Sequence, residues 1–221
     1  MPLTLPKPII YLITDGATTS QTTSASKDFA RLLNLVDAAV AARISFIQLR
    51  EKYLTTRVLY DLAREAAQIT RDSFTRLLVN DRADVARAAG ADGVHLTTRS
   101  MGTSLVRQTF GDQFLIGTSA HSLREVQKAA EDQADFAVFG PVFDTPSKNR
   151  FGQPQGLTEL AQVAAAVKPF PVVALGGVKL ENVADCFRVG SSGIAGIRLL
   201  NEVTELRRVV EEISKSFELQ Q

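Results

Sequence analysis

Short apolar runs rich in β-branched residues alternate along the chain with longer stretches of helical period, and this alternation predicts the secondary structure. The runs that predict strands are Ile9–Thr14, Phe46–Arg50, Leu77–Asp81, Gly93–Thr97, Phe114–Ala120, Phe136–Val142, Val172–Gly176 and Gly193–Arg198. Helical spacing follows between them, for example over Lys27–Arg43, Thr56–Thr70, Leu123–Asp132, Leu157–Val167 and Leu180–Val189. Parallel strands need crossover connections, so this alternation predicts a (β/α)8 barrel, with a doubly wound open sheet as the alternative.

We expect one domain over residues 1–221, because no Ser/Gly-rich linker divides the chain and α/β barrels reach this length as single units. The first eight residues contain three prolines and predict a loose N-terminal arm. The long irregular segment Phe143–Gly156 contains two prolines and two glycines. Such a segment in a compact domain usually serves function, and we expect it to be an active-site loop.

Composition excludes several classes of protein. The chain has 25 Lys and Arg against 24 Asp and Glu, so it lacks the basic surplus that a nucleic-acid or anionic-membrane partner requires. A single cysteine rules out a disulfide framework. The sequence holds neither an apolar run of about 18 residues nor a leader pattern. We therefore expect a soluble, cytoplasmic protein.

Polar residues cluster at the predicted strand ends, which in a barrel surround the active site. The sharpest cluster is Gln48, Arg50 and Lys52, whose period-two spacing places the three side chains on one face of an extended strand. Two cations inside a barrel need an anion to offset their desolvation, and an Arg fork beside a Lys ammonium suits a phosphate or pyrophosphate. The alternative is an exposed strand end where Glu51 pairs with the cations.

The third predicted strand ends in Asn80 and Asp81, which adds a carboxylate beside the cations. Mg²⁺ takes few protein ligands and shares its other positions with phosphate oxygens and water, so Asp81 is a candidate metal ligand. The alternative is that Asp81 caps a helix over Ala83–Ala89.

Two further segments are candidate phosphate sites. Thr145, Ser147 and Lys148 lie in the irregular segment, where two hydroxyls and an ammonium could close over an anion, although such residues are common in loops. Gly176 and Gly177 follow the seventh strand, where barrels usually bind phosphate through backbone N–H groups. A plain tight turn is the alternative there.

The two histidines, His95 and His121, both lie near predicted strand ends. An imidazole in such a place either transfers protons near neutral pH or serves as a structural hydrogen-bond partner. The histidines and Cys186 lie too far apart in sequence for zinc-ligand spacing. Cys186 belongs to the apolar pattern of Val183–Val189, and we expect it in the core.

Seven segments resemble, in order, the motifs of one enzyme family. They are Tyr11–Asp15 (YLITD), Gln48–Lys52 (QLREK), Val79–Asp81 (VND), Ala91–Leu96 (ADGVHL), Gly117–Ser122 (GTSAHS), Phe139–Lys148 (FGPVFDTPSK) and Ala174–Val178 (ALGGV). Over this span the chain is similar to thiamine-phosphate synthase and to its relative, the thiazole tautomerase TenI. The set of motifs is highly specific, and QLREK and GPVFDTPSK are its most specific members.

The resemblance implies a (β/α)8 barrel that joins an aminopyrimidine methyl diphosphate to a thiazole ethyl phosphate, with Mg²⁺ at the departing pyrophosphate. Carried over residue by residue, it implies that Gln48 contacts the pyrimidine and that Asp81 is a Mg²⁺ ligand. Arg50, Lys52 and Asn80 would hold the diphosphate.

The remaining motifs imply roles on the other side of the barrel. Ser119 would lie beside the leaving oxygens, and Lys148 would reach the pyrophosphate. Thr145 and Ser147 would line the thiazole phosphate, to which Gly177 would offer its backbone N–H. Barrels of this type often form homodimers, although no segment of the sequence marks an interface.

Two positions depart from the synthase pattern. A second Mg²⁺-binding Asp of the synthases corresponds to Ser100, whose hydroxyl is a much weaker ligand. A phosphate-binding Ser corresponds to Arg198, which could hold phosphate or fill the pocket. Both departures favour the tautomerase, which needs no Mg²⁺–diphosphate and whose acid–base residue corresponds to His121.

The retained QLREK and VND segments favour the synthase, which is the predicted activity. A non-catalytic relative that only binds phosphate ligands is a further alternative. A sugar-phosphate isomerase on the same fold would need a pair of acid–base carboxylates, for which Asp15 and Asp81 are the clear candidates.

Overall fold

The protein is described by a computed structural model over residues 5–145 and 153–220. Eight parallel strands pair in sequence order, and they are β1 (Ile9–Ile13), β2 (Phe46–Leu49), β3 (Arg76–Asn80), β4 (Gly93–Leu96), β5 (Leu115–Ala120), β6 (Phe136–Phe139), β7 (Val172–Leu175) and β8 (Gly193–Gly196). The pairing of β1 with β8 closes the sheet. The predicted (β/α)8 barrel is therefore confirmed, and the doubly wound open sheet is wrong.

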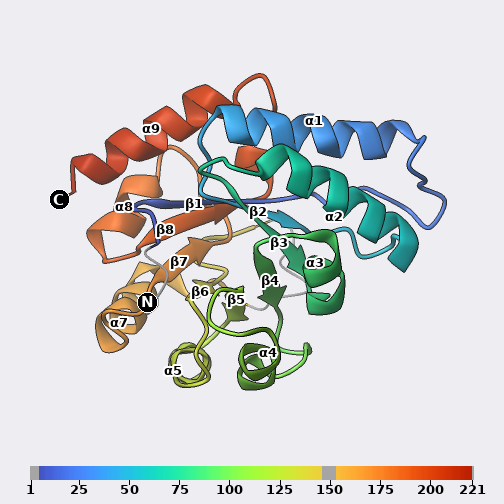
Figure 1. The fold of residues 1–221 in the computed structure, drawn as a ribbon. Coiled ribbons are helices and arrows are strands. Elements are labelled where there is room, and N and C mark those ends of the chain that lie inside the picture. Colours follow the sequence, from blue (N-terminus) through green and yellow to red (C-terminus); the bar gives the residue numbers. More distant parts are fainter. Residues whose placement is uncertain (1–4, 146–152, 221) are drawn as a thin grey trace.

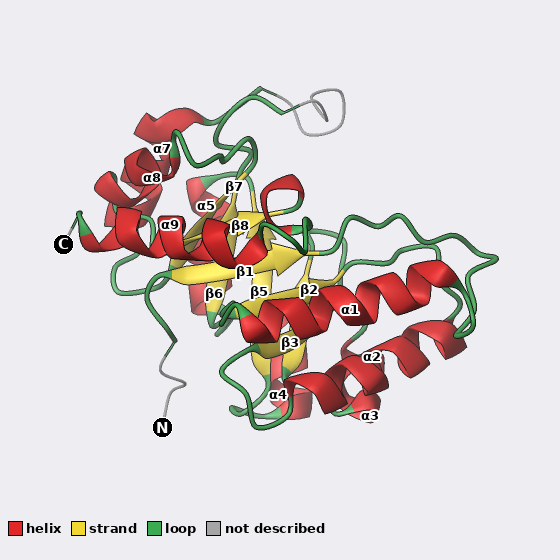
Figure 2. Cartoon of the chain, turned by 90° about the horizontal axis from the view of Figure 1, so that it is seen from above, coloured by secondary structure: helices red, strands yellow, loops and turns green. Residues whose placement is uncertain are grey.

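Helices surround the strands on the outside of the barrel (Figures 1 and 2). They are α1 (Lys27–Ala41), α2 (Thr56–Thr70), α3 (Ala83–Ala89), α4 (Thr103–Phe110), α5 (Leu123–Glu131), α7 (Gly156–Ala166), α8 (Val183–Arg188), the 3₁₀ turn η1 (Arg198–Leu200) and α9 (Leu206–Glu218). None of the helices in the described part of the chain has the length and apolarity needed to cross a bilayer.

The predicted elements differ from the observed ones mainly at their ends. The sixth predicted strand ran to Val142, but β6 ends at Phe139, two residues before Pro141, which has no N–H to donate to a ladder. The eighth ran to Arg198, which instead begins η1. The sequence prediction also did not single out α4 or α9. Of the predicted arm and active-site loop, residues 1–4 and 146–152 lie outside the described residues.

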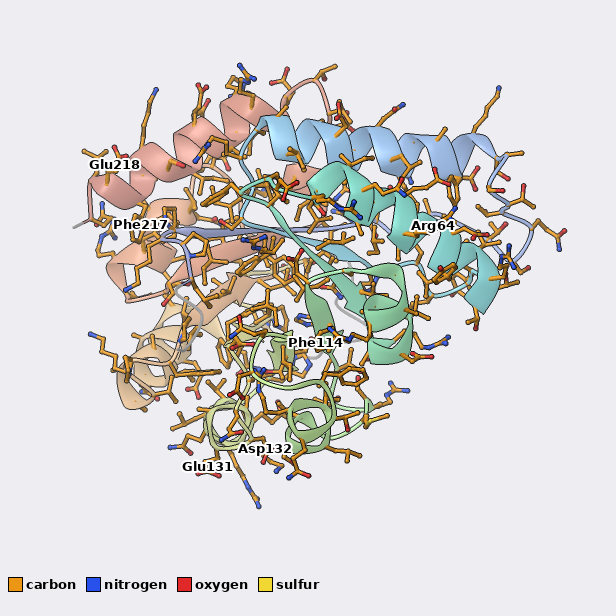
Figure 3. All side chains as sticks on the ribbon, viewed as in Figure 1. Arg64, Phe114, Glu131, Asp132, Phe217 and Glu218 are labelled. Atoms are coloured by element: carbon orange, nitrogen blue, oxygen red, sulfur yellow. The ribbon has the colours of Figure 1, made fainter. Side chains whose placement is uncertain are left out.

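Side-chain alternation along the strands separates two cores. On β1, Ile9, Tyr11 and Ile13 belong to the cluster inside the barrel, whereas Ile10 and Leu12 belong to the cluster between the sheet and the helices. Charged side chains lie on the outer faces of the helices, as Arg64 and Glu131 show, while Phe114 is buried (Figure 3). The interior is therefore a packed core, and enzymes of this fold bind their substrates above it, at the carboxyl ends of the strands.

Candidate active site at the barrel mouth

The last inward-facing positions of four neighbouring strands are polar. They are Gln48 on β2, Asn80 on β3, His95 on β4 and Ser119 on β5. The strand register places Asn80 beside His95, and Gln48 Nε2 donates to Asn80 Oδ1 over 2.7 Å. His95 Nε2 lies 2.9 Å from Ser119 Oγ. Three predicted site residues, Gln48, Asn80 and Ser119, thus lie at the carboxyl ends of strands β2, β3 and β5.

Both carboxylate oxygens of Asp81 accept hydrogen bonds. Oδ2 accepts from Asn80 Nδ2 over 2.7 Å. Oδ1 accepts from the backbone N–H of Thr97 at 3.3 Å, from the Thr97 hydroxyl at 3.1 Å and from the Ser100 hydroxyl. The N-cap of α3 is Arg82, which makes no side-chain cap bond. Asp81 is therefore not a helix cap, and that alternative is wrong.

Asp81 orients the side-chain amide of Asn80, and Asn80 in turn orients that of Gln48. A carboxylate only accepts, so Asn80 turns its NH₂ group toward Asp81 and its Oδ1 toward Gln48. Gln48 in turn points Nε2 at Asn80, and its Oε1 is a buried acceptor with no partner among the described residues. A buried acceptor without a donor is costly, so a ligand amino group is a suitable partner for Gln48 Oε1.

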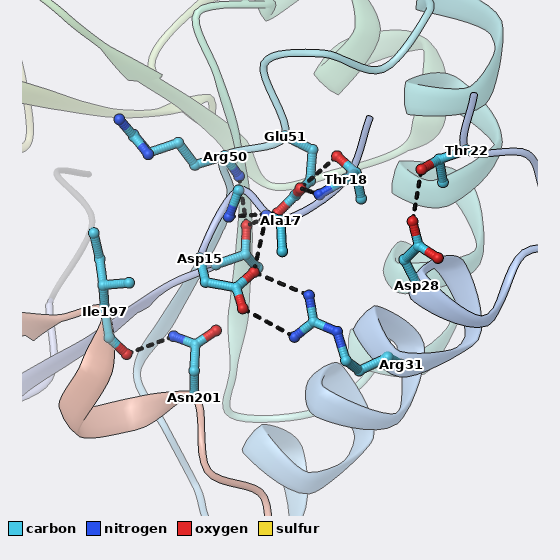
Figure 4. A network of polar contacts seen from close by, with 12 residues as sticks. Asp15, Ala17, Thr18, Thr22, Asp28, Arg31, Arg50, Glu51, Ile197 and Asn201 are labelled. Carbon is cyan, nitrogen blue, oxygen red and sulfur yellow. Dashed lines mark hydrogen bonds and ion pairs between the residues drawn. The ribbon is translucent and has the colours of Figure 1, made fainter. Parts of the chain in front are cut away.

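Glu51 is only 3% exposed, although it stands between two cations in the sequence. Its Oε1 accepts from the Thr14 hydroxyl at 2.6 Å and from the Gly16 N–H at 3.3 Å. Its Oε2 accepts from the Thr18 hydroxyl at 2.6 Å and from the Thr18 N–H at 3.3 Å (Figure 4). The structure thus places the Glu51 carboxylate against the β1–α1 loop, where hydroxyls and backbone N–H groups hold it. The predicted extended strand through Gln48, Arg50 and Lys52 is wrong, because β2 ends at Leu49.

Arg50 and Lys52 lie on either side of Glu51, half-buried and exposed respectively. The Arg50 N–H donates to the Thr14 hydroxyl over 2.8 Å, so the same threonine joins the backbone of Arg50 to the carboxylate of Glu51. The Arg50 side chain crosses the loop at Gly16, where an added Cβ would lie 3.6 Å from Nη1.

Asp15, at the end of β1, forms a two-pronged ion pair with Arg31 of α1. The two N–H···O distances are 3.1 and 2.9 Å (Figure 4). Asp15 therefore links the first loop to the first helix, which argues against its use as one of two acid–base carboxylates.

His95 is 2% exposed, and both of its ring nitrogens have partners. Nδ1 lies 3.2 Å from the Tyr11 hydroxyl, and Nε2 faces Ser119. Burial lowers the pKa of His95 to about 4, so the imidazole is neutral at pH 7. These contacts favour the structural interpretation of His95 over proton transfer.

His121 follows β5 and is half-buried. Its Nδ1 lies 2.6 Å from the Gly140 carbonyl oxygen, and its backbone N–H donates to Glu125 over 2.5 Å.

Cys186 is fully buried, and desolvation raises the pKa of its thiol to about 12, so its predicted place in the core is confirmed.

Gly176 and Gly177 both have positive φ, at 98° and 64°. A Cβ on Gly177 would overlap the carbonyl oxygen of Asp144, and Phe143 N–H donates to Gly176 O over 2.9 Å. The two glycines therefore form a tight turn packed against the segment after β6. Thr145 is half-buried at the end of that segment. Ser147 and Lys148 lie outside the described residues.

Arg198 is exposed at the start of η1, beyond the end of β8. Near it, Asn201 donates to the carbonyl of Ile197 at 2.6 Å (Figure 4). It also donates to the carbonyl of Ile13 at 2.8 Å, which ties β1 to the segment after β8. The sequence analysis did not single out Asn201 or Thr14, and no local pattern marks them, because their partners come from distant segments.

A metal would find one carboxylate ligand here. Within residues 5–145 and 153–220, no three His, Cys, Asp or Glu side chains lie close enough together to hold an ion. Asp81 Oδ2 accepts one hydrogen bond and retains a second lone pair. The residues fit a Mg²⁺ ion that takes its other ligands from a diphosphate and from water, and they do not form a complete cage.

A closed (β/α)8 barrel with polar and cationic side chains at the carboxyl ends of its strands defines the class of barrel enzymes that bind their substrates at the mouth. The model of one family, described as thiamine monophosphate synthase, matches residues 10–200. The chain belongs to this family, as the resemblance of its motifs predicted.

Individual relatives agree with this assignment. The chain is 36% identical over 189 residues to a thiamine-phosphate synthase of Caldicellulosiruptor bescii, covering 84% of this chain and 86% of the relative. It is 40% identical over 161 residues to that of Chloroflexus aurantiacus, covering 73% and 74%. The solved structure of a thiamine phosphate pyrophosphorylase from Pyrococcus furiosus superposes with a TM-score of 0.77 at 29% identity and covers 96% of both chains. These relatives support the predicted class of enzyme, a transferase.

Proposed function

We propose that this chain is a thiamine-phosphate synthase, which couples 4-amino-2-methyl-5-pyrimidinylmethyl diphosphate to 4-methyl-5-thiazolylethyl phosphate and releases pyrophosphate. Family membership and the named relatives support this activity. The observation that supports a substrate site at the barrel mouth is the series of hydrogen bonds from Asp81 through Asn80 to Gln48. This series leaves Gln48 Oε1 as a buried acceptor without a donor among the described residues. The amino group of the pyrimidine is a donor of the kind that this acceptor lacks.

In the proposed reaction, the C–O bond between the pyrimidine methylene and the diphosphate breaks, and its electron pair leaves with the pyrophosphate. The lone pair of the thiazole nitrogen then forms the new C–N bond. This exchange needs positive charge at the leaving group more than it needs an acid or a base. Arg50 and Lys52 would neutralise the diphosphate, Asn80 would bind it, and Ser119 would donate a hydrogen bond to its oxygens.

Mg²⁺, when bound, would supply further charge neutralisation at the leaving pyrophosphate. Asp81 would hold it through Oδ2, the oxygen with the single hydrogen bond. On the other side of the mouth, the thiazole phosphate would meet Thr145, the Gly177 N–H and Arg198. The roles of Ser147 at this phosphate and of Lys148 at the pyrophosphate remain predictions.

The thiazole tautomerase is the second candidate, and one contact favours it. The Ser100 hydroxyl donates to Asp81, at the position that corresponds to a carboxylate in the synthase pattern. In that reaction His121 would carry the proton, and the cations would bind a single phosphate.

One assay separates these candidates. The purified protein is incubated with both substrates and Mg²⁺, and thiamine phosphate is detected as its fluorescent oxidation product. We expect product that disappears when EDTA is added. Absence of product, in a preparation where a control synthase turns over the same substrates, would overturn the proposal and direct the next assay to the tautomerase or to simple binding. Cytoplasmic location and a homodimeric assembly remain predictions.

A further inference from the structure

Three residues form a buried hydrogen-bonded row that leads from the barrel interior to the mouth. Tyr11 is fully buried on β1, His95 lies above it on β4, and Ser119 ends the row on β5, half-buried. The Tyr11 hydroxyl lies 3.2 Å from His95 Nδ1, and His95 Nε2 lies 2.9 Å from Ser119 Oγ. Within residues 5–145 and 153–220, the three side chains make no other hydrogen bonds.

The imidazole in this row is held in one place. His95 packs against the rings of Tyr11 and Phe136, with centroids 5.7 and 6.4 Å away. Gly117, the neighbour of His95 on β5, leaves the space that the ring occupies, because a Cβ there would come within 2.9 Å of Nδ1. The ring therefore cannot turn away from Tyr11 or Ser119 without displacing the barrel core.

The buried phenol decides the direction of the hydrogen bonds. Tyr11 has one O–H donor, and His95 Nδ1 is its only acceptor. If Tyr11 donates, Nδ1 must be unprotonated, so a neutral imidazole carries its proton on Nε2 and donates it to Ser119. In the reverse direction, Nδ1–H would donate to Tyr11, and the phenol proton would be buried with no acceptor.

We propose that Tyr11 and His95 are positioning residues that direct the proton of Ser119 into the mouth. Nε2–H of His95 occupies a lone pair of Ser119 Oγ, so the serine hydroxyl is not used as a donor within the row. It is then oriented to donate to an anion above it. The destination, the leaving diphosphate oxygens, rests on the proposed function, whereas the direction of the row rests on the geometry alone.

The direction can be measured without substrate, by long-range ¹H–¹⁵N correlation of the imidazoles at pH 7. The chain has only two histidines, and the second is an internal reference, because His121 Nδ1 faces a carbonyl oxygen and must carry a proton. We expect His95 to be the neutral Nε2–H tautomer, with its signals assigned by their survival in His121→Gln. A His95 signal with the proton on Nδ1, or a charged ring, would overturn the proposal.

The function of the row is tested by a double-mutant cycle. His95→Leu should lower kcat about tenfold with little change in KM, and His95→Gln should restore most of it, because Gln places an N–H near the Nε2 position. In a Ser119→Ala background, His95→Leu should cost no more than about twofold further, since its effect passes through the serine.

A merely structural His95 would give the same loss in both backgrounds, and that result would overturn the positioning role. If His95→Leu does not fold, the comparison of Tyr11→Phe with and without Ser119→Ala replaces it. If the wild type has no synthase activity, the proposed function fails while the tautomer measurement still decides the direction of the row.

Discussion

Two carboxylates at the ends of neighbouring strands, Glu51 after β2 and Asp81 after β3, are held in different ways. Glu51 is 3% exposed and accepts four hydrogen bonds from the β1–α1 loop. Asp81 is exposed and also accepts four, but three of them converge on Oδ1. The first carboxylate is fully enclosed by protein donors, and the second keeps one oxygen open to a ligand.

The two carboxylates accept the same number of hydrogen bonds but differ in their roles. The donors around Glu51 are hydroxyls and backbone N–H groups, so its charge organises the loop beside the cations. Asp81 orients Asn80 and Gln48 through one oxygen while that same oxygen retains a lone pair. We infer that Glu51 is a structural anchor of the mouth and that Asp81 belongs to the ligand site.

The largest expected effect concerns the two cations that flank Glu51. If Arg50 and Lys52 neutralise the leaving diphosphate, Arg50→Ala and Lys52→Ala should each lower turnover by about 10²-fold or more. Pyrophosphate release measures this, and Arg43→Ala is a matched control, because Arg43 stacks over Phe74. Undiminished release in both variants would remove the cations from the site.

We expect removal of Glu51 and removal of Asp81 to lower the free energy of unfolding by different amounts. Glu51→Ala leaves four donors of the first loop, three of them on the buried Thr14 and Thr18, without this acceptor, and we expect it to lower the free energy of unfolding by about 3 kcal/mol. Asp81→Ala should cost about 1 kcal/mol or less, because water can replace an exposed carboxylate. Equilibrium unfolding in urea measures both variants. Equal losses of unfolding free energy in the two variants would show that the burial of Glu51 does not make its hydrogen bonds more stabilising than those of Asp81.

The smallest expected effect is a gain at Asp81. Ser100→Asp places a second carboxylate next to that of Asp81 and should tighten Mg²⁺ binding about tenfold, as measured by calorimetry with inorganic pyrophosphate present. Ser100→Ala is the control, because it removes the hydroxyl donor without adding a ligand. An unchanged affinity in Ser100→Asp would indicate that this part of the mouth does not bind metal.

Much of the candidate site could be predicted from local sequence. Gln48, Asn80 and Ser119 stand at strand ends with the period of two that turns them inward, and the structure pairs Gln48 with Asn80 and Ser119 with His95. The end of the eighth strand was placed wrongly, because an apolar run does not show where the backbone turns into a 3₁₀ helix at Arg198. The bonds from Thr14 and Thr18 to Glu51 span more than thirty residues in the chain, and no local pattern encodes them.

The sequence by itself determined the alternation of strands and helices, the barrel class, the family and the inward positions of the polar strand ends, because each depends on the period of nearby residues or on motif order. Only the tertiary structure decided which carboxylate is enclosed, which way the amides of Asn80 and Gln48 point, and what surrounds the imidazole of His95. Those properties depend on donors and acceptors brought together from separate strands, and closure of the barrel is what brings them within hydrogen-bonding distance.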